Sequence, residues 1–409
     1  MEIEEAVKRI IAEINPIRES ETVPLDQACG RVLAEKIAAP FAVPHFPKSA
    51  MDGYAVCAES VKDASEEHPV HLRVIGEILA GDVWDEELSN DIDKTASTVR
   101  VMTGALVPDG FDAVVKQEDT DYGESEVLIR HGVEPYMNYC KVGEDIAAGS
   151  TVLPAGRKLG RVEAGVLASL GISEVPVVRR PAVTVISTGS ELKSLSGSDA
   201  SGTAPGQGKI YNSIYYTLSA SLTQAGFSAA GRVVPDETEA IAEAIKQALA
   251  VSDVVITTGG VSVGKRDLLP EVLETLGAER VFAGVNIQPG TPTIGSVLNG
   301  KAILSLSGNP YAALVNFDLY FWPLAAELTG CDAYLPKREK AVLKSEYPKV
   351  NRLRRFVRAR AEEGTVTLPA KSHASSVLSN LLDCNCYIDL NENMKVSPGD
   401  TVSIVRMPE

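Results

Sequence analysis

Strand and helix periods alternate in the middle of the chain, from about residue 181 to 329. Apolar runs without polar alternation, such as 182–187 and 253–258, predict strands that are buried on both faces. Between these runs, apolar residues recur at helical spacing, as in 212–225 and 310–328. Strands that alternate with helices of this length predict right-handed βαβ units. We therefore expect a doubly wound, mainly parallel central sheet with helices on both faces.

The flanking regions follow other patterns. Apolar and charged residues at helical spacing predict a helix over 2–14, and Pro16 ends it. From about 20 to 178, short β-branched runs broken by Gly, Pro and Asp predict mostly strands and turns, with one helix at 161–170. After Pro336 the strand pattern returns. We therefore expect β-rich N-terminal domains and a small C-terminal β domain around an α/β core.

Size and charge narrow the function classes. The chain has 409 residues, which at about 150 residues per domain suggests two to four domains. It carries 55 acidic and 39 basic residues, a formal net charge of -16. A surface this acidic repels phosphate backbones and anionic lipid at long range, so we expect no nucleic-acid partner and no membrane partner. An anionic small ligand would need local backbone donors or a basic pocket.

The first residues, Met-Glu-Ile-Glu-Glu, lack the basic and apolar segments of a secretory signal, which predicts a cytoplasmic protein. The apolar stretch 311–328 contains Asn316, Asp318 and Pro323, and it predicts a buried helix rather than a membrane span.

The six cysteines are too sparse for a disulfide framework, and the five histidines are too scattered for a zinc site. Cys384 and Cys386 are two residues apart in a strand-like run, so their side chains share a face. We interpret them as buried small hydrophobic residues, with a metal or redox role as the alternative.

Three loops that follow predicted strands carry runs of Gly, Ser and Thr, at 187–191, 257–264 and 305–310. Ligands of open parallel sheets bind at the carboxyl ends of strands. Glycines let the backbone approach a ligand and expose N–H groups, and hydroxyl groups add donors. The loops together therefore predict an anion-binding site at one edge of the sheet.

The second loop also fits part of a P-loop, because Gly259 to Lys265 reads G-x-x-x-x-G-K. Arg266, however, stands where a P-loop needs Ser or Thr for magnesium, so we do not predict nucleotide hydrolysis by this motif. Asp267 is either a metal or polar ligand or the N-cap of the next helix. Glu191 either coordinates a cation or positions water, or is a solvated loop acid.

Two further positions have structural interpretations. Asp236 and Glu239 match a capping box ahead of an amphipathic helix. Asn309 and Pro310 fit an N-cap and the first residue of a helix.

The chain resembles the molybdopterin molybdenumtransferase family, the bacterial MoeA and gephyrin E-domain group, in seven ordered stretches. These are Ser-Ala-Met-Asp-Gly-Tyr-Ala (49–55), Met-Thr-Gly-Ala (102–105) with Asp-Ala-Val-Val (112–115), Val-Gly-Glu-Asp-Ile (142–146), Ser-Thr-Gly-Ser-Glu-Leu (187–192), Gly-Lys-Ile-Tyr-Asn-Ser (208–213), Thr-Thr-Gly-Gly-Val-Ser-Val-Gly (257–264) with Asp267, and Ser-Gly-Asn-Pro (307–310). They span nearly the whole chain.

This resemblance implies an L-shaped protomer of four domains and an elongated homodimer. The expected limits are 1–46 with 141–178 for an N-terminal dimerisation domain, 47–140 for an inserted β-rich domain, 179–329 for an α/β molybdopterin-binding domain, and 330–409 for a C-terminal β-barrel-like domain.

The resemblance also implies a reaction. The family uses adenylylated molybdopterin and molybdate, cleaves the adenylate with the help of Mg²⁺ or another divalent cation, releases AMP, and leaves molybdenum on the dithiolene. The molybdopterin adenylylating enzyme and other proteins of the cofactor pathway are the partners that it suggests.

Site residues follow from the matching stretches as expectations. Asp52 and Thr103 would approach the cleft from the partner subunit, and Asp145 would support it. Glu191 and Asp267 would bind the metal and, with Asp52 and Thr103, act in catalysis. The remaining substrate-binding residues would be Ser187, Thr188, Gly189, Asp236, Gly259, Gly260, Ser262, Lys265, Ser307, Gly308 and Asn309, with a looser match at Arg358 and Ser372.

One segment departs from the family. Where the family usually carries lysines around Lys-Pro-Gly-Lys-Pro, residues 284–292 read Gly-Val-Asn-Ile-Gln-Pro-Gly-Thr-Pro. The absence of these cations lowers the expected anion affinity unless Lys265, Arg266 or Lys209 replaces them. Ser190, where the family often has Asp, removes one acid.

These departures leave two alternatives to an active transferase. With Gly284, Gln288 and Thr291 at the lysine segment, the chain could be a molybdopterin-binding relative with altered or no metal insertion, such as a carrier or a protein that handles tungstate. The gephyrin relative suggests the other alternative, a dimeric scaffold that binds a partner peptide.

Overall fold

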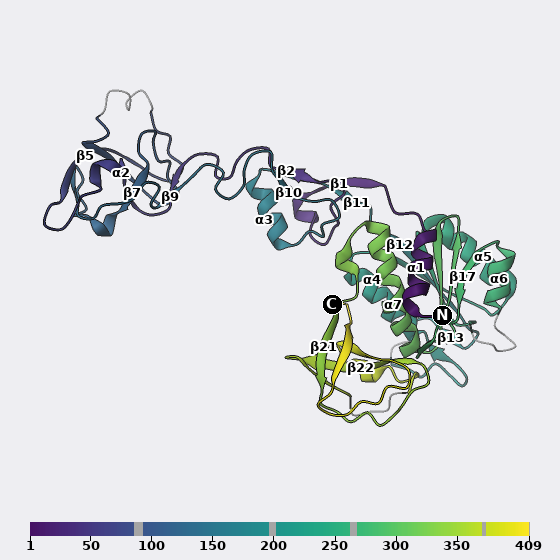
Figure 1. The fold of residues 1–409 in the computed structure, drawn as a ribbon. Coiled ribbons are helices and arrows are strands. Elements are labelled where there is room, and N and C mark those ends of the chain that lie inside the picture. Colours follow the sequence, from purple (N-terminus) through teal and green to yellow (C-terminus); the bar gives the residue numbers. More distant parts are fainter. Residues whose placement is uncertain (86–92, 196–201, 262–267, 370–373, 409) are drawn as a thin grey trace. The chain divides into compact units, whose positions relative to one another are not determined.

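A computed structural model describes residues 1–85, 93–195, 202–261, 268–369 and 374–408 (Figure 1). The chain divides into two units. The first unit contains Met1–Glu35, Ala155–Arg161 and Glu174–Glu409, and the second contains Lys36–Pro154 and Val162–Ser173. The domain limits expected from the sequence stay a prediction.

A six-stranded sheet forms the centre of the first unit, in the order β15-β12-β16-β20-β19-β17. The strands are β15 (Ser228–Val234), β12 (Ala182–Thr188), β16 (Val254–Thr258), β20 (Lys301–Leu306), β19 (Ile294–Leu298) and β17 (Glu279–Ala283). The first four are parallel, and β19 and β17 are antiparallel to their neighbours. The sheet is therefore mainly parallel, as predicted.

Helices cover both faces of this sheet (Figure 1). On one face, α4 (Ser213–Gln224), α7 (Pro310–Thr329) and α1 (Ile3–Glu13) bury apolar residues against Val185 and Ile256. On the other, α5 (Thr238–Val251) and α6 (Leu269–Thr275) pack against Val255 and Ile303. Successive residues of β16 thus serve two hydrophobic cores, which explains why its sequence does not alternate.

The C-terminal strands close into a small barrel. They are β21 (Arg338–Leu343), β22 (Arg354–Glu362), β23 (Thr365–Thr367), β24 (Cys386–Leu390) and β25 (Thr401–Arg406). The order is β22-β23-β21-β25-β24, and β24 also pairs with β22, so the barrel has no free edge. A short strand from the α/β core, β18 (Ile287–Gln288), pairs with β22 in parallel. The first unit also contains the antiparallel pair β1 (Ser20–Pro24) and β11 (Glu174–Val178).

The second unit contains a five-stranded sheet in the order β7-β4-β6-β5-β8. Its strands are β4 (Gly53–Val56), β5 (Val70–Ile78), β6 (Ser97–Val101), β7 (Ala113–Lys116) and β8 (Glu126–Ile129), and the unit also holds the pairs β2 (Ile37–Ala38) with β10 (Thr151–Leu153) and β3 (Lys48–Ser49) with β9 (Tyr139–Cys140). Its helices are α2 (Ala58–Val61) and most of α3 (Arg161–Ser169). The sheet buries Tyr54 and Val115 on one face and Ala55 and Val114 on the other.

Within the described residues, none of the helices combines the length and the apolar character that a membrane crossing requires. The long helix α7 buries Asn316 and Asp318 within the first unit.

Candidate functional site

The described parts of the three Gly-, Ser- and Thr-rich loops meet at one edge of the central sheet, because β12, β16 and β20 are adjacent and parallel. The Thr188 hydroxyl donates to the Thr258 carbonyl over 3.4 Å, and the Thr258 hydroxyl donates to Ser187 Oγ over 3.0 Å. The Gly259 N–H donates to the Leu306 carbonyl over 3.1 Å. Hydrogen bonds therefore join the beginnings of all three loops.

Gly259 lies where the three loops are in close contact. Its φ is +94°, and an added Cβ would stand 2.7 Å from the Thr188 carbonyl oxygen and 2.9 Å from Thr188 Oγ1. A Cβ on Gly308 would stand 3.5 Å from the Gly259 Cα. Both the conformation and the space require glycine at 259. The structure thus brings together Thr188, Gly259 and Gly308, three of the residues that the sequence placed at a common edge.

Several hydroxyl-bearing residues of this site are buried, and part of its backbone is exposed. Ser187, Thr188 and Ser307 are buried, whereas Gly308 and Asn309 are exposed. Asn309 is the N-cap residue of α7, as predicted, but its side chain makes no capping hydrogen bond. At the start of α7 the Asn309 N–H donates to Ser307 Oγ, Pro310 has no N–H, and the Tyr311 N–H donates to the Ser375 carbonyl. Backbone donors for an anion would therefore come from the glycine loops.

Two acids flank the first loop. The exposed Glu191 carboxylate lies over Gly189, where an added Cβ would be 2.7 Å from both carboxylate oxygens. Asp236 Oδ2 accepts a hydrogen bond from the Ser190 N–H over 3.1 Å. The predicted capping box is therefore wrong: Glu237 is the N-cap residue of α5 and no side chain caps that helix. Asp236 contacts the first loop instead. It follows β15, and β15 pairs in parallel with β12, the strand that precedes this loop.

A lysine contacts the same loop. Lys209 Nζ donates to the Ser190 carbonyl oxygen over 2.5 Å, so an acid and a cation hold the Ser190 backbone from two sides. The strand pair β13 (Leu192–Lys193) and β14 (Ile210–Tyr211) positions Lys209 just before β14.

Several predicted residues cannot be assigned a position. Asp267, Ser262, Lys265 and Ser372 lie outside the described residues. Of the predicted metal pair, Glu191 alone is therefore described. Among the described His, Cys, Asp and Glu residues, no group of three is placed to hold a metal ion.

In the second unit, Asp52 and Thr103 are in contact although 51 positions separate them. Asp52 Oδ1 accepts hydrogen bonds from the Thr103 N–H and from the Thr103 hydroxyl, each over 2.7 Å. These hydrogen bonds hold the pKa of the Asp52 carboxyl below its usual value. Thr103 is exposed at the end of β6, and Asp145 is exposed on a separate loop of this unit.

Arg358, one of the looser predicted substrate-binding matches, makes its contacts within the protein. It is fully buried on β22, its Nη2 donates to the Ala374 carbonyl over 2.7 Å, and its Nη1 donates to the Val377 carbonyl. The guanidinium also lies 4.0 Å from the centroid of the Tyr311 ring. Burial lowers the pKa of Arg358. In this arrangement the side chain joins the barrel to the start of α7.

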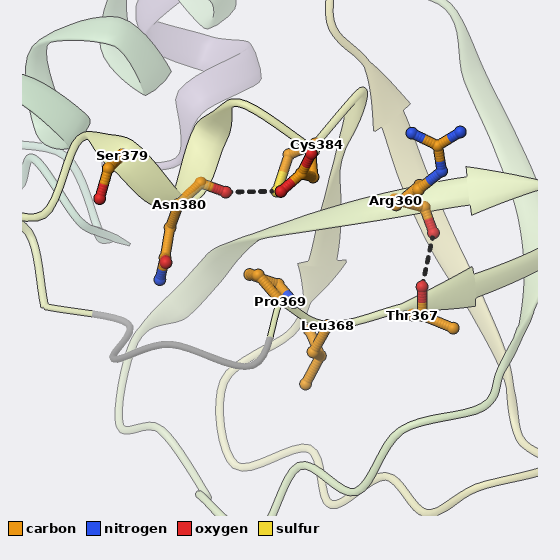
Figure 2. Close-up of a pocket in the computed structure, with 8 residues that line it drawn as sticks. Arg360, Thr367, Leu368, Pro369, Ser379, Asn380 and Cys384 are labelled. Carbon is orange, nitrogen blue, oxygen red and sulfur yellow. Dashed lines mark hydrogen bonds between the residues drawn. The ribbon is translucent and has the colours of Figure 1, made fainter.

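A pocket of about 270 Å³ opens in the C-terminal barrel beside Arg360, Thr367 and Cys384 (Figure 2). The Cys384 thiol donates to the Asn380 carbonyl over 3.0 Å, and burial raises the pKa of this thiol. All six cysteines are free. Cys386 is buried, as predicted, whereas Cys384, for which burial was also predicted, is only half-buried. None of the residues that line this pocket was predicted for the site.

Comparisons with known proteins agree along the whole chain. Family models match it in order: the MoeA N-terminal region (domain I and II) over 1–171, a probable molybdopterin binding domain over 184–327, and the MoeA C-terminal region (domain IV) over 340–406. A molybdopterin molybdenumtransferase from Staphylococcus epidermidis is 36% identical over 392 residues, covering 95% of this chain and 91% of the relative. The chain belongs to the molybdopterin molybdenumtransferase family.

Other relatives in this family support the same assignment. One from Staphylococcus aureus is 33% identical over 408 residues, covering 98% of this chain and 94% of the relative. The solved molybdopterin biosynthesis moeA protein from Pyrococcus horikoshii OT3 matches with a TM-score of 0.85 and 30% identity over the full length of both chains. The predicted family and fold class are therefore confirmed.

The structure also places the segment that departs from the family. Gln288, at the expected lysine segment, is exposed on β18 and pairs with Arg355 on β22. Arg355 Nε is buried and has no hydrogen-bond partner among the described residues. Because paired residues of parallel strands share a face, Arg355 adds a guanidinium beside the position that lacks a lysine. No sequence pattern pointed to this residue, since the β18–β22 pairing joins segments that are distant in the chain.

Proposed function

We propose that the chain inserts molybdate into adenylylated molybdopterin, with release of AMP, as a molybdopterin molybdenumtransferase of molybdenum cofactor biosynthesis. The contact among Thr188, Gly259 and Gly308 carries this proposal, because it joins three loops of donors at the sheet edge where parallel sheets bind ligands. Backbone N–H groups and buried hydroxyls suit the phosphate of the substrate.

The proposed cation is Mg²⁺, bound through Glu191 and Asp267. Carboxylate oxygens are the protein ligands that Mg²⁺ prefers, and none of the described cations forms an ion pair with Glu191. When bound, the cation would neutralise charge as the phosphoanhydride breaks. Asp236 and Lys209 would orient the Ser190 backbone, and with it the neighbouring Glu191.

The proposed active form is a cytoplasmic homodimer. In it, Asp52 and Thr103 of one protomer would serve the three loops of the other, and the molybdopterin adenylylating enzyme would supply the substrate. The exposure of Thr103 supports its proposed role at the loops of the other protomer. The free state of all six cysteines supports a reducing compartment.

The proposed function is tested by AMP release. Purified protein with adenylylated molybdopterin, Mg²⁺ and molybdate should release AMP, and the Glu191→Gln variant should release it much more slowly. Glu239→Gln, which removes an exposed acid on α5, is the matched control and should keep the rate. Release no faster than in a protein-free control would reject the proposal.

Gln288 favours a second candidate, a molybdopterin-binding relative that does not insert molybdate. This candidate predicts that molybdopterin binds tightly to the unmodified chain and to Glu191→Gln alike, without AMP release from either. Replacing molybdate by tungstate in the same assay would show whether the metal preference has changed.

A further inference from the structure

A second pocket, of about 490 Å³, lies between the end of α7 and the end of β25. Trp322 of α7 lines it, together with residues 333–337 and 406–408. Trp322 is 13 positions after Asn309, so at 1.5 Å per helical residue it lies about 20 Å along α7 from the three loops. The pocket is therefore separate from the candidate site.

The walls of this pocket carry a surplus of positive charge. Lys158, Lys337 and Arg406 line it, and Glu339 is the acid among its lining residues. Glu339 is already paired with Arg406 over 2.9 Å. Throughout the described part of the chain, no carboxylate forms an ion pair with Lys158 or Lys337. In a chain with a net charge of -16, two uncompensated ammonium groups at one pocket attract an anion.

One of these lysines is fixed in place. Lys158 Nζ lies 4.6 Å from the centroid of the Tyr334 ring, a cation–π distance. The Tyr334 ring stacks on Trp322, with centroids 6.2 Å apart and planes at 12°. The Trp322 Nε1 donates to Asp318 over 3.0 Å, which holds the indole. The floor is thus a rigid stack of rings that orients the ammonium group before a ligand arrives.

The remaining wall is apolar and accessible. Leu335 is 45% exposed, and Pro336, Met407 and Pro408 also line the pocket. An apolar surface next to two ammonium groups that form no ion pair within the described residues suits a molecule with an apolar ring at one end and an anionic group at the other. The cavity volume falls in the usual range for small-ligand pockets, roughly 300 to 1,000 Å³.

We propose that this pocket binds a small phosphate monoester that carries an apolar ring. Its phosphate would lie between Lys158 and Lys337, and its ring would lie against Leu335 and Met407. A phosphate monoester has a charge of about -2 near pH 7, which matches the two ammonium groups. The inference does not depend on the proposed function, because no residue of the three loops takes part in it.

Trp322 reports on this pocket directly. The chain has two tryptophans, so Trp84→Phe leaves Trp322 as the only fluorescent indole. Titration with AMP or phenyl phosphate should give a saturable change in Trp322 fluorescence. Adenosine, which lacks the phosphate, and inorganic phosphate, which lacks the ring, should each bind at least about tenfold more weakly. No saturable change with either ester, or equal binding of adenosine or inorganic phosphate, would overturn the proposal.

Variants locate the binding site. Lys158→Gln combined with Lys337→Gln should weaken ester binding by at least about tenfold, while Lys246→Gln, an exposed lysine on α5, should not. Lys158→Arg, which keeps the charge, should restore most of the binding lost in Lys158→Gln and guards against a folding defect. The double variant and the unmodified chain should not differ in AMP release from the proposed substrate, whatever the rate of the unmodified chain is. A fluorescence change that survives the lysine variants but disappears in Gly259→Ala would assign binding to the three loops and contradict the inference.

Discussion

Asp318 is a buried acid that the proposed reaction does not use. It is 3% exposed on α7, where Oδ1 accepts from Trp322 Nε1 over 3.0 Å and Oδ2 accepts from the Tyr387 hydroxyl over 2.7 Å. Burial raises its pKa from 3.8 to about 6, and the two hydrogen bonds offset this only in part. The carboxyl therefore joins α7 to β24 of the barrel at an electrostatic cost near neutral pH.

This cost predicts a pH-dependent effect of Asp318→Asn. A folded pKa above the unfolded value means that the contribution of Asp318 to stability is fully present below pH 3.8 and is lost as the pH rises to about 6. Asn stays neutral at all of these pH values. Relative to the unmodified chain, the free energy of unfolding of Asp318→Asn should therefore rise over this interval, by up to about 3 kcal/mol. Urea unfolding of both chains in the Trp84→Phe background, followed by Trp322 fluorescence at pH 4 and pH 7.5, measures the difference in the free energy of unfolding. If the difference in the free energy of unfolding between the two chains is the same at both pH values, the assigned pKa of Asp318 is contradicted.

At the scale of elements, α1 is tied to the barrel by an ion-pair network. Arg354 on β22 donates to Asp389 Oδ1 and Oδ2, each over 2.7 Å, and to Glu4 on α1 over 2.9 Å. Arg338 on β21 adds a 2.6 Å hydrogen bond to Asp389. Burial raises the pKa of Asp389, but these two arginines more than offset it and hold the pKa below its usual value.

Asp389→Asn should therefore destabilise the first unit. The substitution leaves two arginines without their buried carboxylate, a loss of roughly 3 kcal/mol in the free energy of unfolding. Asp383→Asn, at an exposed position before β24, should change it by less than about 0.5 kcal/mol. Denaturant midpoints of both variants give the comparison, and equal midpoints would show that the network does not stabilise the fold.

The sequence predicted elements better than it predicted contacts between distant ones. The apolar run of β16 predicts a strand and the amphipathic spacing of α5 predicts a helix, because each pattern depends only on the residues of that element. The antiparallel strands β17 and β19 were missed, since both are short and lack a clear period. In the site, parallel topology was enough to bring three loops together, but Asp236 was assigned to a helix cap because its contact with Ser190 depends on which strands are neighbours.

At the scale of the whole molecule, the proposed homodimer predicts complementation between inactive variants. Asp52 and Thr103 belong to the second unit, and Glu191 and Gly259 belong to the first. If one protomer supplies Asp52 to the loops of the other, a mixture of Asp52→Ala and Glu191→Ala chains contains heterodimers with one intact site.

After subunit exchange, the mixture of these two variants should regain about a quarter of the AMP release of the unmodified chain, because half of the dimers are mixed and each has one of two sites. Each variant alone should be nearly inactive. A mixture that forms heterodimers on a column with two different tags, yet stays inactive, would show that each protomer uses its own Asp52.

The central claim is that three loops in contact at Gly259 bind the phosphorylated pterin, and the dissociation constant of molybdopterin tests it most directly. Gly259→Ala places a methyl group 2.7 Å from the Thr188 carbonyl oxygen and should weaken binding by more than about tenfold. Gly226→Ala has a similar positive φ, +86°, with no atom within 4 Å, and should leave the constant unchanged. Equal binding by the unmodified chain and Gly259→Ala would contradict the account.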